Sequence, residues 1–65
     1  MDLQVGDTVI VTKNFDMSIY DFLIGKIGTI TDVEEQDIFV QFDYDEEWAT
    51  DEYIFNVAEI EQHNQ

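Results

Sequence analysis

Cysteine and arginine are absent from this sequence of 65 residues, and cationic side chains of any kind are scarce. Without cysteine the chain has no disulfide, no thiolate nucleophile and none of the usual zinc or iron–sulfur ligand sets. Only Lys13 and Lys26 oppose 16 acidic residues, so the formal net charge is −14. Proteins bind nucleic acid with cations that replace the counterions on its phosphates, and anionic membrane surfaces attract basic segments in the same way. We therefore expect no direct contact with nucleic acid or membrane, and we predict a basic protein surface as the partner.

Long apolar runs are missing as well. No stretch approaches the roughly 20 apolar residues of a membrane span. The first 13 residues, MDLQVGDTVIVTK, have neither the basic start nor the apolar core of a signal peptide. We expect a cytoplasmic protein.

The acidic residues are concentrated in the second part of the chain. Residues 27–65 hold twelve acids and no Lys or Arg, and the acids are densest over residues 43–52. Hydrophobic residues nevertheless make up 45% of the chain and aromatic residues 14%, too many for an acidic disordered tail. The length allows a single domain, residues 1–65, with residues 63–65 expected to fray.

The hydrophobic pattern is that of short β-strands. β-Branched and aromatic residues alternate with polar ones, and glycines mark the turns between the apolar segments. The strands expected are 8–12, 26–33, 38–42, 49–55 and 59–62. Only residues 19–24 have mixed helical character, where Ser18 can cap one turn. Five short strands, with one long loop after the first, predict an all-β barrel.

The core of this barrel is predicted from the apolar positions that alternate within the strands. The residues expected inside are Val5, Val9, Val11, Ile27, Ile30, Val33, Ile38, Val40, Phe42, Ile54, Val57 and Ile60.

Four short motifs resemble those of SH3-like β-barrels. VGDTV at 5–9 resembles their opening, GKIGTI at 25–30 resembles the core of the KOW motif, and VQFD at 40–43 resembles the end of their third strand. NVAEI at 56–60 resembles their closing turn and terminal strand. The order of the motifs is similar to that of photosystem I reaction-centre subunit IV and the ferredoxin–thioredoxin reductase variable chain. The resemblance implies a small five-stranded SH3-like barrel with one long loop after the first strand.

The charge of the chain departs from the pattern of these families. KOW domains that bind RNA carry basic loops, which this chain lacks. The photosystem subunit supports the docking of ferredoxin, an acidic protein that the acids of residues 27–65 would repel. The resemblance therefore implies a fold, and we carry over neither RNA binding nor ferredoxin binding.

Residues with a chemical signature are few. Asp43, Asp45 and Glu47 have the alternate spacing that begins a calcium-binding loop. Trp48, however, stands where such a loop needs glycine, and the twelfth position lacks the bidentate Glu, so a solvated acidic loop is the simpler interpretation. His63, the single histidine, lies in a polar tail with no nucleophile signature beside it. We expect no catalytic residue, no metal site, no cofactor and no enzymatic activity.

Aromatic residues interleave with the acids of residues 43–52. An aromatic anchor surrounded by charge is typical of an interaction hot spot. The alternative is that Trp48 covers one end of the barrel and Phe55 fills the core. The partner-binding residues that we predict are Asp43, Tyr44, Asp45, Glu46, Glu47, Trp48, Asp51 and Glu52.

The segment 14–24 offers a second candidate contact. Seven of its eleven residues are apolar, too many for an ordinary polar loop. Phe15, Tyr20 and Phe22 are the predicted secondary contact with a partner or a second copy. Whether the chain is a monomer or a homodimer stays open.

These features predict a non-enzymatic, acidic protein-interaction module. Carboxylates on a rigid barrel can imitate a row of phosphates, so we expect a DNA-mimicking inhibitor that docks on the basic cleft of a nucleic-acid-binding protein. Phages and mobile elements commonly encode proteins of this kind. The alternative is a structural accessory subunit of a larger complex of redox or photosynthetic type.

Overall fold

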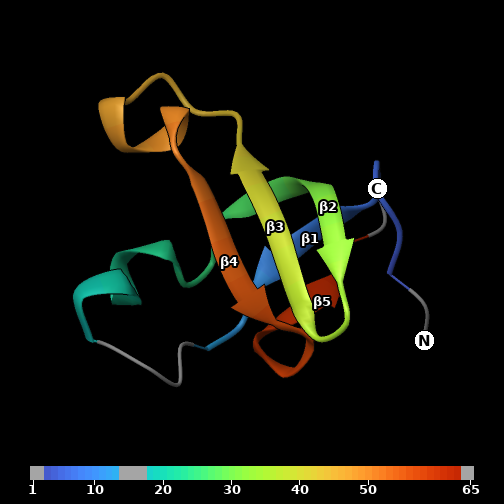
Figure 1. Ribbon diagram of the computed structural model, residues 1–65. Helices are drawn as coiled ribbons and strands as arrows, with labels where there is room; N and C mark the ends of the chain where they lie inside the picture. The colour runs from blue at the N-terminus through green and yellow to red at the C-terminus, as the bar shows by residue number, and fades with distance from the viewer. Residues whose placement is uncertain (1–2, 14–17, 64–65) are drawn as a thin grey trace.

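A single antiparallel sheet forms the body of the protein (Figure 1). The computed structural model describes residues 3–13 and 18–63. The strands are β1 (Thr8–Val11), β2 (Ile27–Glu34), β3 (Asp37–Phe42), β4 (Glu52–Asn56) and β5 (Ile60–Gln62). Three short 3₁₀ turns connect them: η1 (Ser18–Leu23), η2 (Glu47–Thr50) and η3 (Val57–Glu59). No α-helix occurs in this described part of the chain, and the prediction of an all-β fold is confirmed.

The five strands lie in the order β4-β3-β2-β1-β5, with the outer strands β4 and β5 not paired to each other. The sheet is therefore open, and the closed barrel is not confirmed. β2 is the longest strand, with eight residues, and its register with β3 shifts between Ile30 and Asp32. An irregularity of this kind bends a strand and increases its twist. It lies between the part of β2 that pairs with β1 and the end that forms a hairpin with β3.

A two-residue turn closes the β2–β3 hairpin. Glu34 pairs with Asp37, and Glu35 between them has a φ of 54°. Positive φ at the first central position is what two-residue hairpin turns require, although glycine or asparagine adopts it more readily than glutamate. The tip of this hairpin therefore combines acidic side chains with an unfavourable backbone conformation.

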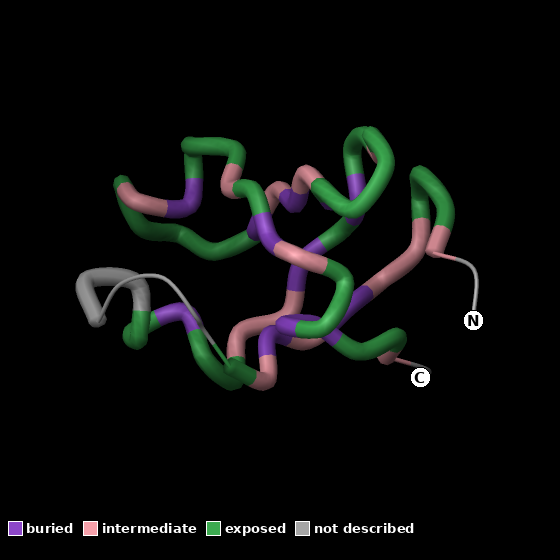
Figure 2. Tube along the Cα trace, turned by 60° about the horizontal axis from the view of Figure 1, so that its bottom comes forward, coloured by how far each residue is buried: buried purple, intermediate pink, exposed green. Residues whose placement is uncertain are grey.

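The core lies on one face of the sheet, and exposed positions gather in the turns (Figure 2). The buried apolar residues are Val9, Val11, Leu23, Ile30, Ile38, Val40, Phe42, Ala49, Phe55 and Ile60. Seven of them were predicted for the core, while the predicted Ile27 and Val33 are half-buried. Leu23 of η1 and Ala49 of η2 were not predicted, because they enter the core from connections rather than from strands.

Three predictions for the core are wrong. Val5 is 62% exposed, Ile54 59% and Val57 42%. In β4 the buried position is Phe55, so its neighbour Ile54 faces outward. Side chains alternate between the faces of a strand, and an error of one position reverses every assignment in it. The strand itself begins at Glu52, because Ala49 belongs to η2.

The turn η3 returns the chain from β4 to β5. The side chain of Asn56 accepts a hydrogen bond from the backbone N–H of Ala58 at 2.9 Å, and the buried Glu59 carboxylate accepts one from the N–H of Asn56 at 2.7 Å. This reciprocal capping satisfies backbone donors at the start of the turn. The carbonyl of Glu59 accepts from the N–H of Thr12 at 2.8 Å. These bonds hold β5 beside β1.

Gly28 lies where β2 is paired on both sides, with Val9 of β1 and Phe42 of β3. A Cβ atom there would lie 2.6 Å from Cγ1 of Val40 and 2.9 Å from the carbonyl oxygen of Gln41. We predict that Gly28→Val lowers the free energy of unfolding by about 3 kcal/mol or more, through overpacking. The control is Thr29→Val, which places valine at the next position along the strand, where the residue is exposed. It should change the free energy of unfolding by less than about 0.5 kcal/mol. Denaturant melts followed by circular dichroism compare the two, and equal losses would contradict the close approach.

A second pair of variants tests which face of the sheet is buried. Ile30 is 1% exposed and Ile54 is 59% exposed, although both are strand isoleucines. We predict that Ile30→Ala costs about 2–5 kcal/mol of unfolding free energy because it leaves a cavity. Ile54→Ala should cost less than about 1 kcal/mol, since it loses mainly β-propensity. A larger loss at Ile54 than at Ile30 would show that the faces are assigned the wrong way round.

Candidate functional site

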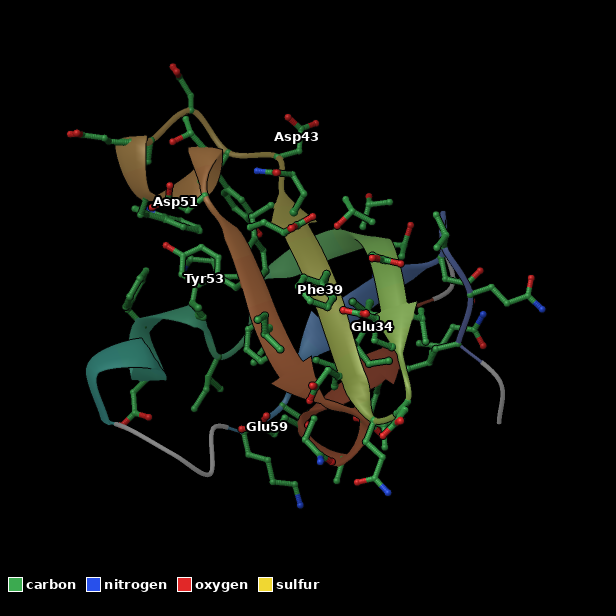
Figure 3. The ribbon with its side chains drawn as sticks, in the orientation of Figure 1. Glu34, Phe39, Asp43, Asp51, Tyr53 and Glu59 are labelled. Carbon is green, nitrogen blue, oxygen red and sulfur yellow. The ribbon has the colours of Figure 1, made fainter. Side chains whose placement is uncertain are left out.

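The connection between β3 and β4 is an ordered acidic turn. Within it, the backbone N–H of Ala49 donates to the carbonyl of Glu46 at 3.1 Å, and the hydroxyl of Thr50 donates to the carbonyl of Glu47 at 2.8 Å. Nε2 of Gln41 on β3 donates to the carbonyl of Ala49 at 2.6 Å. The predicted acids of the turn are all exposed: Asp43, Asp45, Glu46, Glu47 and Asp51. The turn therefore presents several carboxylates from a fixed backbone, at the end of the sheet where Figure 3 shows Asp43 and Asp51.

Trp48 of η2 is the centre of a cluster of aromatic rings. Its ring centroid lies 5.4 Å from that of Phe22, 5.8 Å from that of Phe42 and 5.4 Å from that of Tyr44. The Phe22 and Phe42 rings meet it edge to face, at interplanar angles of 80° and 61°. Such arrangements stabilise aromatic pairs beyond the area they bury. Phe42 in turn contacts Tyr53 and Phe55, so the cluster is continuous with the core.

This continuity supports the structural interpretation of two predicted residues. Trp48 is half-buried and packs against the core, and Phe55 is buried. The side chains that the cluster leaves in solvent are Phe22, 47% exposed, and Tyr44, 39% exposed. A partner that contacts this cluster would therefore meet mainly these two rings, since Trp48 is less exposed.

Polar contacts fix the orientation of the rings. Nε1 of Trp48 donates to the carboxylate of Glu46, and the hydroxyl of Tyr53 donates to the carbonyl of Trp48 at 2.9 Å. The hydroxyl of Tyr44 accepts from the backbone N–H of Ile27 at 3.1 Å. Nζ of Lys26 lies 5.9 Å from the centroid of the Tyr44 ring, within the range of a cation–π interaction. One of the two lysines of the chain thus already lies over an aromatic ring beside the acidic turn.

The structure joins two surfaces that the sequence predicted separately. Phe22 of η1 contacts Trp48 of η2, so the apolar segment after β1 meets the acidic turn after β3. We call the joined region the aromatic–acidic end, and it consists of Phe22, Asp43, Tyr44, Asp45, Glu46, Glu47, Trp48 and Asp51. Phe15 and the side chain of Tyr20 lie outside what the structure describes.

Glu52 differs from the other predicted partner-binding residues. It is the first residue of β4, opposite Gln41, and its carboxylate accepts a hydrogen bond from the hydroxyl of Thr31 on β2. It therefore belongs to the face of the sheet that is turned away from the core. Phe39 and Ile54 lie on that face as well. The sequence prediction placed Ile54 in the core and left Phe39 out of it, but it named neither as a contact residue. The alternation around buried Ile38 and Val40 was a usable signal for Phe39.

Neither a metal centre nor a membrane span is found in the described residues. No three or more His, Cys, Asp or Glu side chains among residues 3–13 and 18–63 gather in a way that could hold a metal ion. No helix in that part of the chain is long and apolar enough to cross a membrane.

Comparison with known protein families, with curated proteins and with solved structures finds no match for this chain. Its function therefore has to be argued from its own residues.

The crowding of negative charge predicts a salt-dependent stability. Folding brings the −14 net charge into a small volume, and added salt shortens the Debye length from about 30 Å at 0.01 M to about 10 Å at 0.1 M. We predict that the midpoint of thermal unfolding rises with NaCl over this range. Sucrose at matched osmolality is the control and should give a smaller rise. A flat or falling midpoint would show that the carboxylates are already compensated in the folded chain.

Proposed function

We propose that this protein is a non-enzymatic interaction module that docks its aromatic–acidic end on the basic cleft of a nucleic-acid-binding protein. The observation that carries the proposal is the position of Trp48, held between Phe22 and Tyr44 and surrounded by exposed carboxylates. Interaction hot spots combine an aromatic anchor with a polar rim in this manner. A cytoplasmic location is compatible with such a role.

The hydrogen bonds within the turn favour mimicry of nucleic acid. Carboxylates that substitute for phosphates have to stay in place without cations of their own. The bonds of Gln41, Glu46 and Tyr53 hold the turn, and residues 27–65 contain no Lys or Arg. A partner with a basic cleft would be steered toward this end by long-range attraction.

We also propose that the open sheet is a variant of the SH3-like barrel. Three features support this proposal: the strand order β4-β3-β2-β1-β5, the irregularity in β2 between Ile30 and Asp32, and the 3₁₀ turn η3 before the last strand. They agree with the resemblance of the sequence motifs to this family. The barrel hosts many unrelated functions, so the proposed activity depends on the surface and not on this assignment.

A structural accessory subunit is the second candidate function. The exposed ring of Phe22 favours it, because an apolar contact of this kind can seat a subunit in a permanent complex. Capture on the immobilised chain, followed by washes of increasing salt, separates the candidates. A nucleic-acid-binding protein that is released by moderate salt, and that competing DNA displaces, supports mimicry. A stoichiometric complex that resists salt supports the subunit.

The role of the acidic turn is tested with charge variants of equal size. Asp45→Asn with Glu47→Gln removes two charges at the aromatic–acidic end and leaves Glu46 bonded to Trp48. We predict that this variant lowers the association rate constant for the captured protein by about three- to tenfold at low salt, and weakens its salt dependence. The control, Glu35→Gln with Glu61→Gln, removes the same charge from exposed positions elsewhere.

Surface-bound kinetics at two salt concentrations measures the difference between these variants. The control should change the association rate constant much less than the variant in the turn. If both variants slow association equally, net charge alone attracts the partner and the acidic turn is not the docking surface.

A further inference from the structure

The outward face of β2, β3 and β4 carries an apolar pair. Phe39 of β3 lies directly opposite Ile54 of β4, and both point away from the core because their neighbours Ile38, Val40 and Phe55 are buried. Figure 3 shows Phe39 at the front of the sheet with Glu34 beside it. Ile54 is 59% exposed and Phe39 is half-buried. The pair therefore presents apolar surface in the middle of a rigid sheet.

Carboxylates surround this pair in positions that the strand register sets. Asp32 lies opposite Phe39 on the β2 side, Glu52 lies two residues before Ile54, and Glu34 and Asp37 face each other below. All four are exposed. We call the whole surface the outer face, and it consists of Asp32, Glu34, Asp37, Phe39, Glu52 and Ile54.

The outer face lowers the folding stability of the isolated chain. Like charges directly opposite each other on neighbouring strands are destabilising, and Glu34 faces Asp37 in this way. The three strands contain no Lys or Arg that could neutralise these carboxylates. Ile54 contributes little burial at its exposed position. Each of these costs would be relieved by an external surface that is apolar at its centre and basic around it.

We propose that the outer face is a second docking surface, which takes a basic amphipathic segment of a protein. An apolar side chain of the segment sits on Phe39 and Ile54, and its Lys or Arg side chains lie on the surrounding carboxylates. A second copy of this chain is disfavoured as the occupant, because it would bring its own carboxylates against these. The proposal involves none of the residues of the aromatic–acidic end and goes beyond the function proposed above.

The test is an NMR titration of the full chain with two synthetic peptides. In the first peptide Val residues at the centre are flanked on both sides by Lys residues, and in the second Ser replaces each Val, so that the charge is the same. We expect the first peptide to shift the backbone amides of Phe39, Ile54 and Asp37, and to bind about tenfold more tightly than the second. Ile54→Thr should remove most of this difference. Val5→Thr, which also replaces an exposed β-branched apolar residue by threonine but lies outside the outer face, should leave it unchanged.

A second variant keeps the test valid if Ile54→Thr disturbs the fold. Glu34→Gln with Asp37→Asn removes the facing charges and relieves their repulsion, so it is expected to fold. It should weaken binding of both peptides about fivefold or more. Asp45→Asn with Glu47→Gln should weaken binding of the first peptide much less. The two double variants therefore show separately whether the outer face and the aromatic–acidic end take part in binding.

Two results would overturn the proposal. Equal binding of both peptides to the original chain and to Ile54→Thr would mean that only net charge is recognised. Concentration-dependent shifts of the Phe39 and Ile54 amides without peptide, together with dimerisation in the ultracentrifuge, would make a second copy the occupant.

Discussion

The close packing of β3 across Gly28 of β2 is the contact on which the rest of the molecule depends. Without a side chain at Gly28, Val40 and Phe42 can reach the centre of the sheet. Phe42 then contacts Trp48, Tyr53 and Phe55, and Trp48 contacts Phe22 and Tyr44. A continuous path of packed rings therefore leads from the middle of the sheet to the surface. The aromatic–acidic end is therefore packed against the core.

Negative charge imposes the second constraint. In a chain of 65 residues with a net charge of −14, carboxylates occupy many of the exposed positions of the strands and turns that the structure describes. Some of these positions are unfavourable, such as the facing pair Glu34 and Asp37 and the positive φ of Glu35. Glu59 is the one buried acid among residues 3–13 and 18–63, and it serves as a cap for η3. The acidic surface therefore costs stability at several places.

The two proposed surfaces differ in how their apolar parts are held. At the aromatic–acidic end, the rings of Tyr44 and Trp48 come from the connection between β3 and β4, and they are fixed by hydrogen bonds with Ile27 and Glu46. On the outer face, strand pairing places Phe39 and Ile54 side by side. Glu52 lies where the two surfaces approach each other, since it opens β4 directly after the acidic turn.

The sequence predicted some parts of the site correctly and missed others. The exposed acids of residues 43–51 were predicted correctly, because carboxylates are too costly to bury without partners. The meeting of Phe22 with Trp48 was not predicted, since the two residues are far apart in the chain and no pattern within either segment indicates the other. Ile54 was misassigned because the segment 49–55 has apolar residues at both alternate sets of positions. The choice between them depended on Phe55 reaching Phe42 across the core.

Local pattern was sufficient for the number of strands, their all-β character and the burial of Ile38, Val40 and Phe42, because strand alternation and turn residues are properties of neighbouring positions. Charge composition predicted a basic partner, and this stays a prediction. The open sheet, the entry of Leu23 and Ala49 into the core, and the gathering of Phe39, Ile54 and their carboxylates on one face were decided only by the tertiary structure. Each of these depends on the register between strands, which arises from contacts between distant residues and is not encoded in any short segment.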